Sequence, residues 1–85
     1  MNPFPGVFRY ESSRDNETRE PTEREARRKG DLISIIHLSI GQRMIIEYKD
    51  GSGVLRTSGV ENLEQYDDML IVTTENTRYV FERVQ

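Results

Sequence analysis

The chain has 85 residues, of which 34% are hydrophobic and 32% charged, and it contains no cysteine. This length allows one domain at most, and the lack of cysteine excludes disulfide bonds and thiolate metal sites. No apolar run reaches the about 18 residues that a membrane-spanning helix needs, and the first residues lack the pattern of a signal peptide. We therefore expect a cytoplasmic protein that does not associate with a membrane.

Charge is unevenly distributed along the chain. Residues 1–30 contain seven basic and six acidic residues, whereas residues 31–85 contain five basic and nine acidic residues, so the net charges are +1 and −4. The second part is also the part expected to fold. A broad phosphate-binding face needs clustered lysine and arginine, so this acidic balance disfavours nucleic acid as the main partner of the folded part.

Residues 1–20 contain two prolines, one glycine and many charges without periodicity, which predicts a mostly disordered segment. Large apolar residues stand out within it, and we consider three of them, Phe4, Phe8 and Tyr10, as candidate partner-binding residues. Two interpretations remain open at this point. These side chains could fold back and cover an apolar edge of the domain, or form a short linear motif that docks into a groove of a partner.

Residues 20–30 carry the signals of a short helix. Pro21 suits the first helical position and Gly30 suits the residue after the end, and acidic residues precede basic ones at i,i+4 spacing. Such a helix would be polar on all sides and marginal on its own. Its basic cluster, which could contact an acidic partner or nucleic acid, consists of Arg24, Arg27, Arg28 and Lys29. The competing interpretation is a solvated linker whose charges largely cancel.

The stretch 31–38 is predicted to be a short amphipathic helix. Asp31 could cap it, and apolar residues recur on one helical face, although its isoleucines favour a strand. Gly41 ends the element. The single histidine, His37, is expected to be an ordinary, partly buried residue, because neither further metal ligands nor a reacting partner for a general base can be identified.

Strands dominate the remainder of the chain. The first is expected at 43–49, followed by a turn at Asp50–Gly53 and a second strand at 54–60 in which Gly59 marks a bulge or bend. Residues 61–68 are predicted to be a polar connection from which Leu63 and Tyr66 reach the core.

The stretch 69–74 has four successive apolar residues and is predicted to be a central strand covered on both faces. A two-residue turn at 75–76 leads to the last strand, 77–84. On this strand Tyr79 and Phe81 share one face, and Val80 and Val84 share the other.

Together these elements predict a mainly β protein, with a small antiparallel sheet or barrel of four to five strands preceded by a short helix. The predicted division is a disordered or partly helical charged tail, residues 1–30, and a small β domain, residues 31–85.

The order of these elements resembles that of Sm-like proteins and other SH3-like small barrels over residues 31–84. The resemblance is carried by Ile45, Glu47, Asp50-Gly51, Gly59-Val60 and Met69-Leu70-Ile71. It implies an Sm-like barrel that forms ring oligomers and binds single-stranded RNA. The chain departs from the family in residues 64–68 and 76–79, which lack the Asp and Asn and the Arg-Gly or Lys-His elements that the family uses.

The sequence contains none of the standard catalytic arrangements. With one histidine and no cysteine, no nucleophilic triad can be identified, and no glycine-rich phosphate loop connects a strand to a helix. We expect no enzyme, no cofactor, no metal site and no small-molecule substrate.

Two functions remain for a domain of this kind. The leading one is a non-catalytic protein-interaction module, a small regulatory or accessory factor, which pairs with a partner or with itself through open strand edges. The alternative is a single-stranded nucleic-acid-binding barrel that adds Arg56, Arg78 and Tyr79 to the basic cluster.

Overall fold

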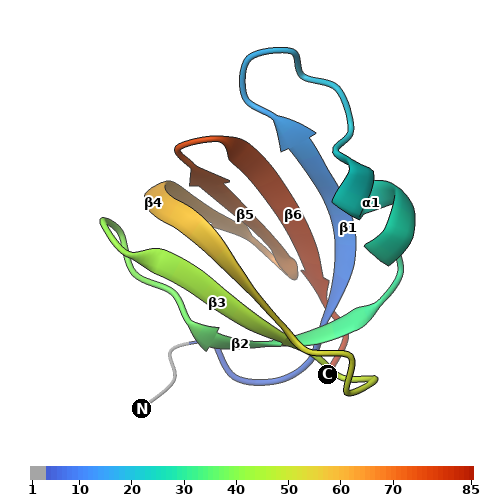
Figure 1. Ribbon diagram of the computed structural model, residues 1–85. Helices are drawn as coiled ribbons and strands as arrows, with labels where there is room; N and C mark the ends of the chain where they lie inside the picture. Colours follow the sequence, from blue (N-terminus) through green and yellow to red (C-terminus); the bar gives the residue numbers. More distant parts are fainter. Residues whose placement is uncertain (1–3) are drawn as a thin grey trace.

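The structure is a computed structural model that describes residues 4–85 (Figure 1). It contains six strands and one short helix, which lies between the first two strands. The strands are β1 (Phe8–Asp15), β2 (Leu32–His37), β3 (Arg43–Tyr48), β4 (Val54–Tyr66), β5 (Met69–Thr74) and β6 (Thr77–Arg83), and the helix is α1 (Glu23–Arg28). The prediction of a mainly β, antiparallel fold is confirmed, and α1 lies within the stretch 20–30 that carries the signals of a short helix.

The six strands form one closed sheet. Each strand pairs antiparallel with the next, and β6 returns to pair with β1, so every strand has two neighbours. The sheet has six strands, whereas four to five were predicted. Each of these strands is paired on both sides, whereas open strand edges were expected. No helix in the described part of the chain is long and apolar enough to cross a bilayer.

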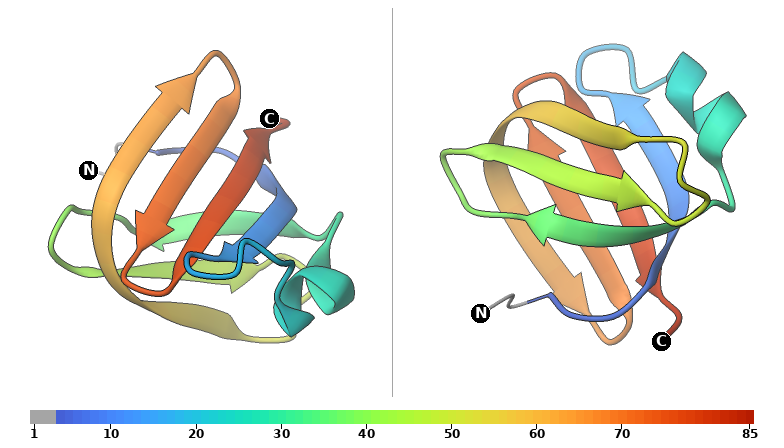
Figure 2. Two further views of the ribbon diagram at one scale, coloured as in Figure 1. Left: turned by 90° about the horizontal axis from the view of Figure 1, so that it is seen from above. Right: turned by 60° about the horizontal axis from the view of Figure 1, so that its bottom comes forward.

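The long strand β4 turns the corner of the closed sheet (Figure 2). Its first part pairs with β3 and its second part with β5, and both pairings shift register on either side of Val60. Bulges of this kind bend a strand, so the predicted bulge or bend at Gly59 is confirmed. The predicted connection at 61–68 is wrong, because residues 62–66 continue β4 and pair with β5. Leu63 packs against the core as expected, whereas Tyr66 is 58% exposed.

The core is filled by alternate side chains that point into the closed sheet. Tyr79 and Phe81 share one face of β6, as predicted; this face is buried, and their stacked rings have centroids 6.1 Å apart. Along β5, Leu70 and Val72 are buried whereas their neighbours are half-buried. The prediction that this strand is covered on both faces is therefore wrong, because the outer face of the closed sheet borders solvent.

The first strand is the largest difference from the sequence prediction. Residues 8–15, predicted to be disordered, form β1, which pairs with β6 along most of its length. Phe8 and Tyr10 are buried in the core and Phe4 packs against it, so these side chains fold back onto the domain. The composition of residues 8–15 does not predict this strand, because its hydrogen-bonding partner, β6, lies at the other end of the chain. Residues 1–3 of the predicted tail lie outside the described residues.

The predicted helix at 31–38 is instead β2. Ile33 and Ile35 point into the core and the strand pairs with β3, so the β-branched residues determine the structure here. His37, expected to be partly buried, is exposed, and its Nε2 lies 2.5 Å from Oε1 of Gln42.

Three buried tyrosines predict how stability depends on pH. Burial raises the pKa of Tyr10, Tyr48 and Tyr79 above the ordinary value of 10.0. The unfolded chain loses these protons near pH 10.0, whereas the folded chain holds them to higher pH, so the stabilisation is complete below pH 10.0 and is lost as the pH rises through the folded-state pKa values. Urea midpoints measured from about pH 8 to 12 should therefore be constant at first and then fall. Midpoints that stay constant across the whole range would contradict this prediction.

Candidate functional site

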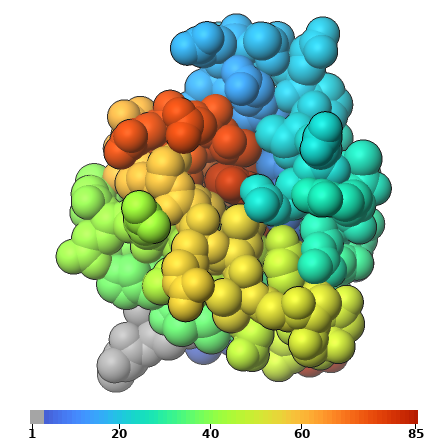
Figure 3. Space-filling view, in the orientation of Figure 1, coloured from blue at the N-terminus to red at the C-terminus, as the bar shows by residue number. Residues whose placement is uncertain are grey.

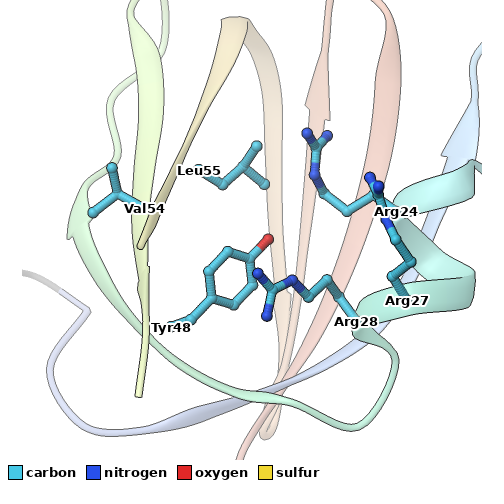
Figure 4. A pocket seen from close by; sticks show the side chains of 6 residues that line it. All are labelled: Arg24, Arg27, Arg28, Tyr48, Val54 and Leu55. Carbon is cyan, nitrogen blue, oxygen red and sulfur yellow. The ribbon is translucent and has the colours of Figure 1, made fainter. Parts of the chain in front are cut away.

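A hollow with a strongly basic wall lies between α1 and the start of β4 (Figure 3). Its volume is about 340 Å³. Figure 4 shows the side chains that line it: Arg24, Arg27 and Arg28 on α1, and Tyr48, Val54 and Leu55 on the β3–β4 hairpin. We call this site the helix hollow. It brings together three of the four basic residues predicted as a cluster and adds an opposing wall from a different part of the chain.

The helix is held against β1 by a buried polar network. The Oε1 atom of Glu25 accepts a hydrogen bond from the Ser13 N–H at 3.0 Å, and the hydroxyl oxygens of Ser13 and Thr22 lie 2.7 Å apart. The Tyr10 hydroxyl donates to Ser13 Oγ at 2.6 Å. Thr22 also caps α1 by accepting from the Glu25 N–H. Because Glu25 faces β1, the arginines before and after it in the helix are turned toward the hollow.

Arg28 connects the helix to the β3–β4 hairpin. Its guanidinium carbon lies 3.8 Å from the centroid of the Tyr48 ring, and its Nη1 lies 3.1 Å from Asp31 Oδ2 and 3.7 Å from Asp50 Oδ2. The hydrogen bond to Asp31 raises the pKa of Arg28, while hydrogen bonds from Ser52 lower the pKa of Asp50. The positive charge of Arg28 is therefore largely satisfied within the protein.

Arg24 and Arg27 are placed differently. In the described part of the chain neither forms an ion pair with a carboxylate. Arg24 is half-buried, and its positive charge opposes the rise in the pKa of Tyr79 that burial causes. Arg27 is exposed. The two guanidinium groups thus leave positive charge available at the rim of the helix hollow.

This arrangement can hold a ligand that is negatively charged on one side and apolar on the other. The arginines can donate paired hydrogen bonds to an oxyanion, and Val54 and Leu55 offer apolar contact on the facing wall. No group of three or more potential metal ligands occurs among residues 4–85.

The remaining candidate residues are distributed over the molecule. Phe8 and Tyr10 lie in the core, where Tyr10 joins the polar network beneath α1 through Ser13, and Lys29 follows the helix without lining the hollow. Of the residues considered for nucleic acid, Arg56 is exposed on β4, Arg78 is exposed on β6, and Tyr79 is only 4% exposed. Sequence reasoning missed Tyr48, Val54 and Leu55, which carry no local signal of a site.

Comparison of the chain with protein-family models, with curated proteins and with solved structures finds no match. The resemblance to Sm-like proteins stays a prediction.

Proposed function

We propose that this protein is a non-catalytic protein-interaction module, a small regulatory or accessory factor, whose helix hollow binds an acidic segment of a protein partner. The observation that carries this proposal is that Arg24 and Arg27, which form no ion pair with a carboxylate among residues 4–85, face an apolar wall of Val54 and Leu55. We also keep the SH3-like or Sm-like small barrel as the proposed fold family, supported by the closed sheet and the bend in β4.

A peptide fits this site better than a nucleic acid strand does. The hollow is compact, and half of its lining residues come from a wall with apolar and aromatic side chains. A nucleic acid needs a basic track along the backbone and exposed aromatic rings for stacking. Here Asp31 and Asp50 lie beside Arg28, and Tyr79 is buried. An aspartate or glutamate next to an apolar residue of the partner would satisfy both walls of the hollow.

Charge reversal at Arg27 tests the proposal. The probes are short peptides that place glutamate beside leucine, with glutamine-substituted peptides as their uncharged counterparts, and binding is followed by fluorescence polarisation. Because a hydrogen bond to a charged group contributes about 1.5–3 kcal/mol, Arg27→Glu should weaken binding at least about tenfold. Arg27 is exposed, so the variant should fold normally.

The matched control is Arg56→Glu, which reverses an exposed arginine outside the hollow and should leave peptide affinity unchanged. Equal binding by the two variants, or no preference for the acidic peptides, would refute the proposal. Tight binding of single-stranded RNA that weakens steeply with salt and requires Arg27 would favour the nucleic-acid alternative.

A further inference from the structure

A second basic hollow lies where β1 ends, beside the turn between β5 and β6. Its volume is about 530 Å³, within the range of small-molecule sites. It shares no residue with the helix hollow and is lined by Arg14, Asp15, Asn16, Arg19, Thr73 and Arg78. We call it the loop hollow.

Like charges are brought together at this site. Arg14 on β1 is the direct cross-strand partner of Arg78 on β6, and both are exposed on the outer face of the sheet. Arg19, from the loop after β1, adds a third guanidinium group. Like charges directly opposite each other on neighbouring strands are unfavourable. None of these three arginines forms an ion pair with a carboxylate in the described part of the chain.

The one acidic residue of the lining is already engaged. The Oδ1 atom of Asp15 accepts hydrogen bonds from the N–H groups of Glu17, at 2.8 Å, and Thr18, at 3.0 Å, and these bonds lower its pKa. Its charge orders the loop and neutralises only part of the arginine charge. The lining therefore keeps a net charge of about +2.

The loop that carries Arg19 is tied to the sheet. The Asn16 N–H donates to the Asn76 carbonyl at 3.0 Å, and Asn16 Nδ2 donates to the Thr74 carbonyl at 2.7 Å. Arg14 Nη1 donates to the Arg19 carbonyl at 3.1 Å. The arginines are thus presented by a braced loop and two strands, which reduces the cost of ordering them around a ligand.

We propose that the loop hollow binds the phosphate group of a small phosphorylated molecule. A phosphate monoester carries a charge of about −1.5 to −2 near pH 7 and offers three acceptor oxygens, which matches the three guanidinium groups that line the hollow. All six lining residues are polar or charged, and Asn16 and Thr73 add hydrogen-bonding groups to the three arginines, so the site suits a compact ligand that carries several acceptor oxygens. This site is separate from the peptide site proposed above.

Calorimetric titration with inorganic pyrophosphate at constant ionic strength tests the inference, with inorganic phosphate and a nucleoside diphosphate as second and third probes. Arg78→Gln should weaken pyrophosphate binding at least about tenfold, because a charge-assisted contact is lost. Arg56→Gln, an exposed arginine outside the hollow, is the matched control and should bind as the parent does. Since Arg78→Gln removes one of two opposed like charges, its melting temperature should not fall.

Equal pyrophosphate binding by Arg78→Gln and Arg56→Gln, or no binding to the parent, would overturn the inference. Binding of a single-stranded oligonucleotide or an unphosphorylated acidic peptide in preference to all three phosphate probes, lost in Arg78→Gln, would replace it with a macromolecular interface. The Arg27→Glu variant should retain pyrophosphate binding, so failure at the loop hollow and failure at the helix hollow can be distinguished.

Discussion

Replacing Tyr10 by alanine is expected to lower the free energy of unfolding by about 3–5 kcal/mol, the range for truncating a large buried aromatic side chain. Tyr10 is fully buried, and its ring makes edge-to-face contacts with Phe81, at a centroid distance of 5.6 Å, and with Tyr79, at 6.3 Å. Truncation opens a cavity in the core and removes the hydrogen bond from the Tyr10 hydroxyl to Ser13. Urea denaturation followed by circular dichroism measures the effect.

Tyr66→Ala is the matched control, since Tyr66 is 58% exposed at the end of β4 and its loss should change the free energy of unfolding by no more than about 0.5 kcal/mol. If Tyr10→Ala proves too unstable to measure, Tyr10→Phe keeps the ring and should cost about 1 kcal/mol for the lost hydrogen bond. Equal stabilities for Tyr10→Ala and Tyr66→Ala would mean that the first strand does not belong to the core.

The strands after Gly41 were predictable because their signals are local. Dense β-branched and aromatic residues mark β3, β5 and β6, and Asp50–Gly53 and Glu75-Asn76 form the turns between neighbours in sequence. Each of these strands pairs with the element next to it along the chain. Patterns of alternation and turn chemistry therefore carry enough information to place them.

The strands in the first third of the chain could not be predicted from such local patterns. β1 is polar outside its buried positions, and its main partner is β6, with Phe8 opposite Arg83. β2 has isoleucines that fit either a helical face or a strand, and the pairing with β3 decides between them. Disorder and helix were predicted there because a local pattern does not show which distant strand supplies the missing hydrogen bonds.

The candidate site likewise has one part that local sequence patterns predict and another that depends on distant residues. The basic cluster on α1 was predicted from spacing alone, and Arg24, Arg27 and Arg28 do meet at one hollow. The opposing wall comes from Tyr48, Val54 and Leu55, about two dozen residues further along, and only the closed sheet brings it opposite the helix. One usable signal was missed, since Thr22 followed by Glu25 has the spacing of a capping box and marks the start of α1.

The last prediction concerns Glu25, which fixes the orientation of the helix. Glu25→Ala is expected to lower the free energy of unfolding by about 1–3 kcal/mol, because it leaves the buried N–H of Ser13 without its acceptor. The variant should also weaken binding of acidic peptides to the helix hollow, because the arginines lose the contact that turns them toward it. Urea denaturation and fluorescence polarisation measure the two effects on the same protein.

Two further variants separate the role of the Glu25 oxygen from that of helical charge. Glu23→Ala removes an exposed carboxylate from the first turn of α1 and should change stability by no more than about 0.5 kcal/mol. Glu25→Gln keeps a carbonyl oxygen able to accept from Ser13, so its stability and peptide affinity should lie between those of the parent and of Glu25→Ala. If Glu25→Ala binds peptide as tightly as Glu23→Ala does, the docked helix is not what positions the arginines.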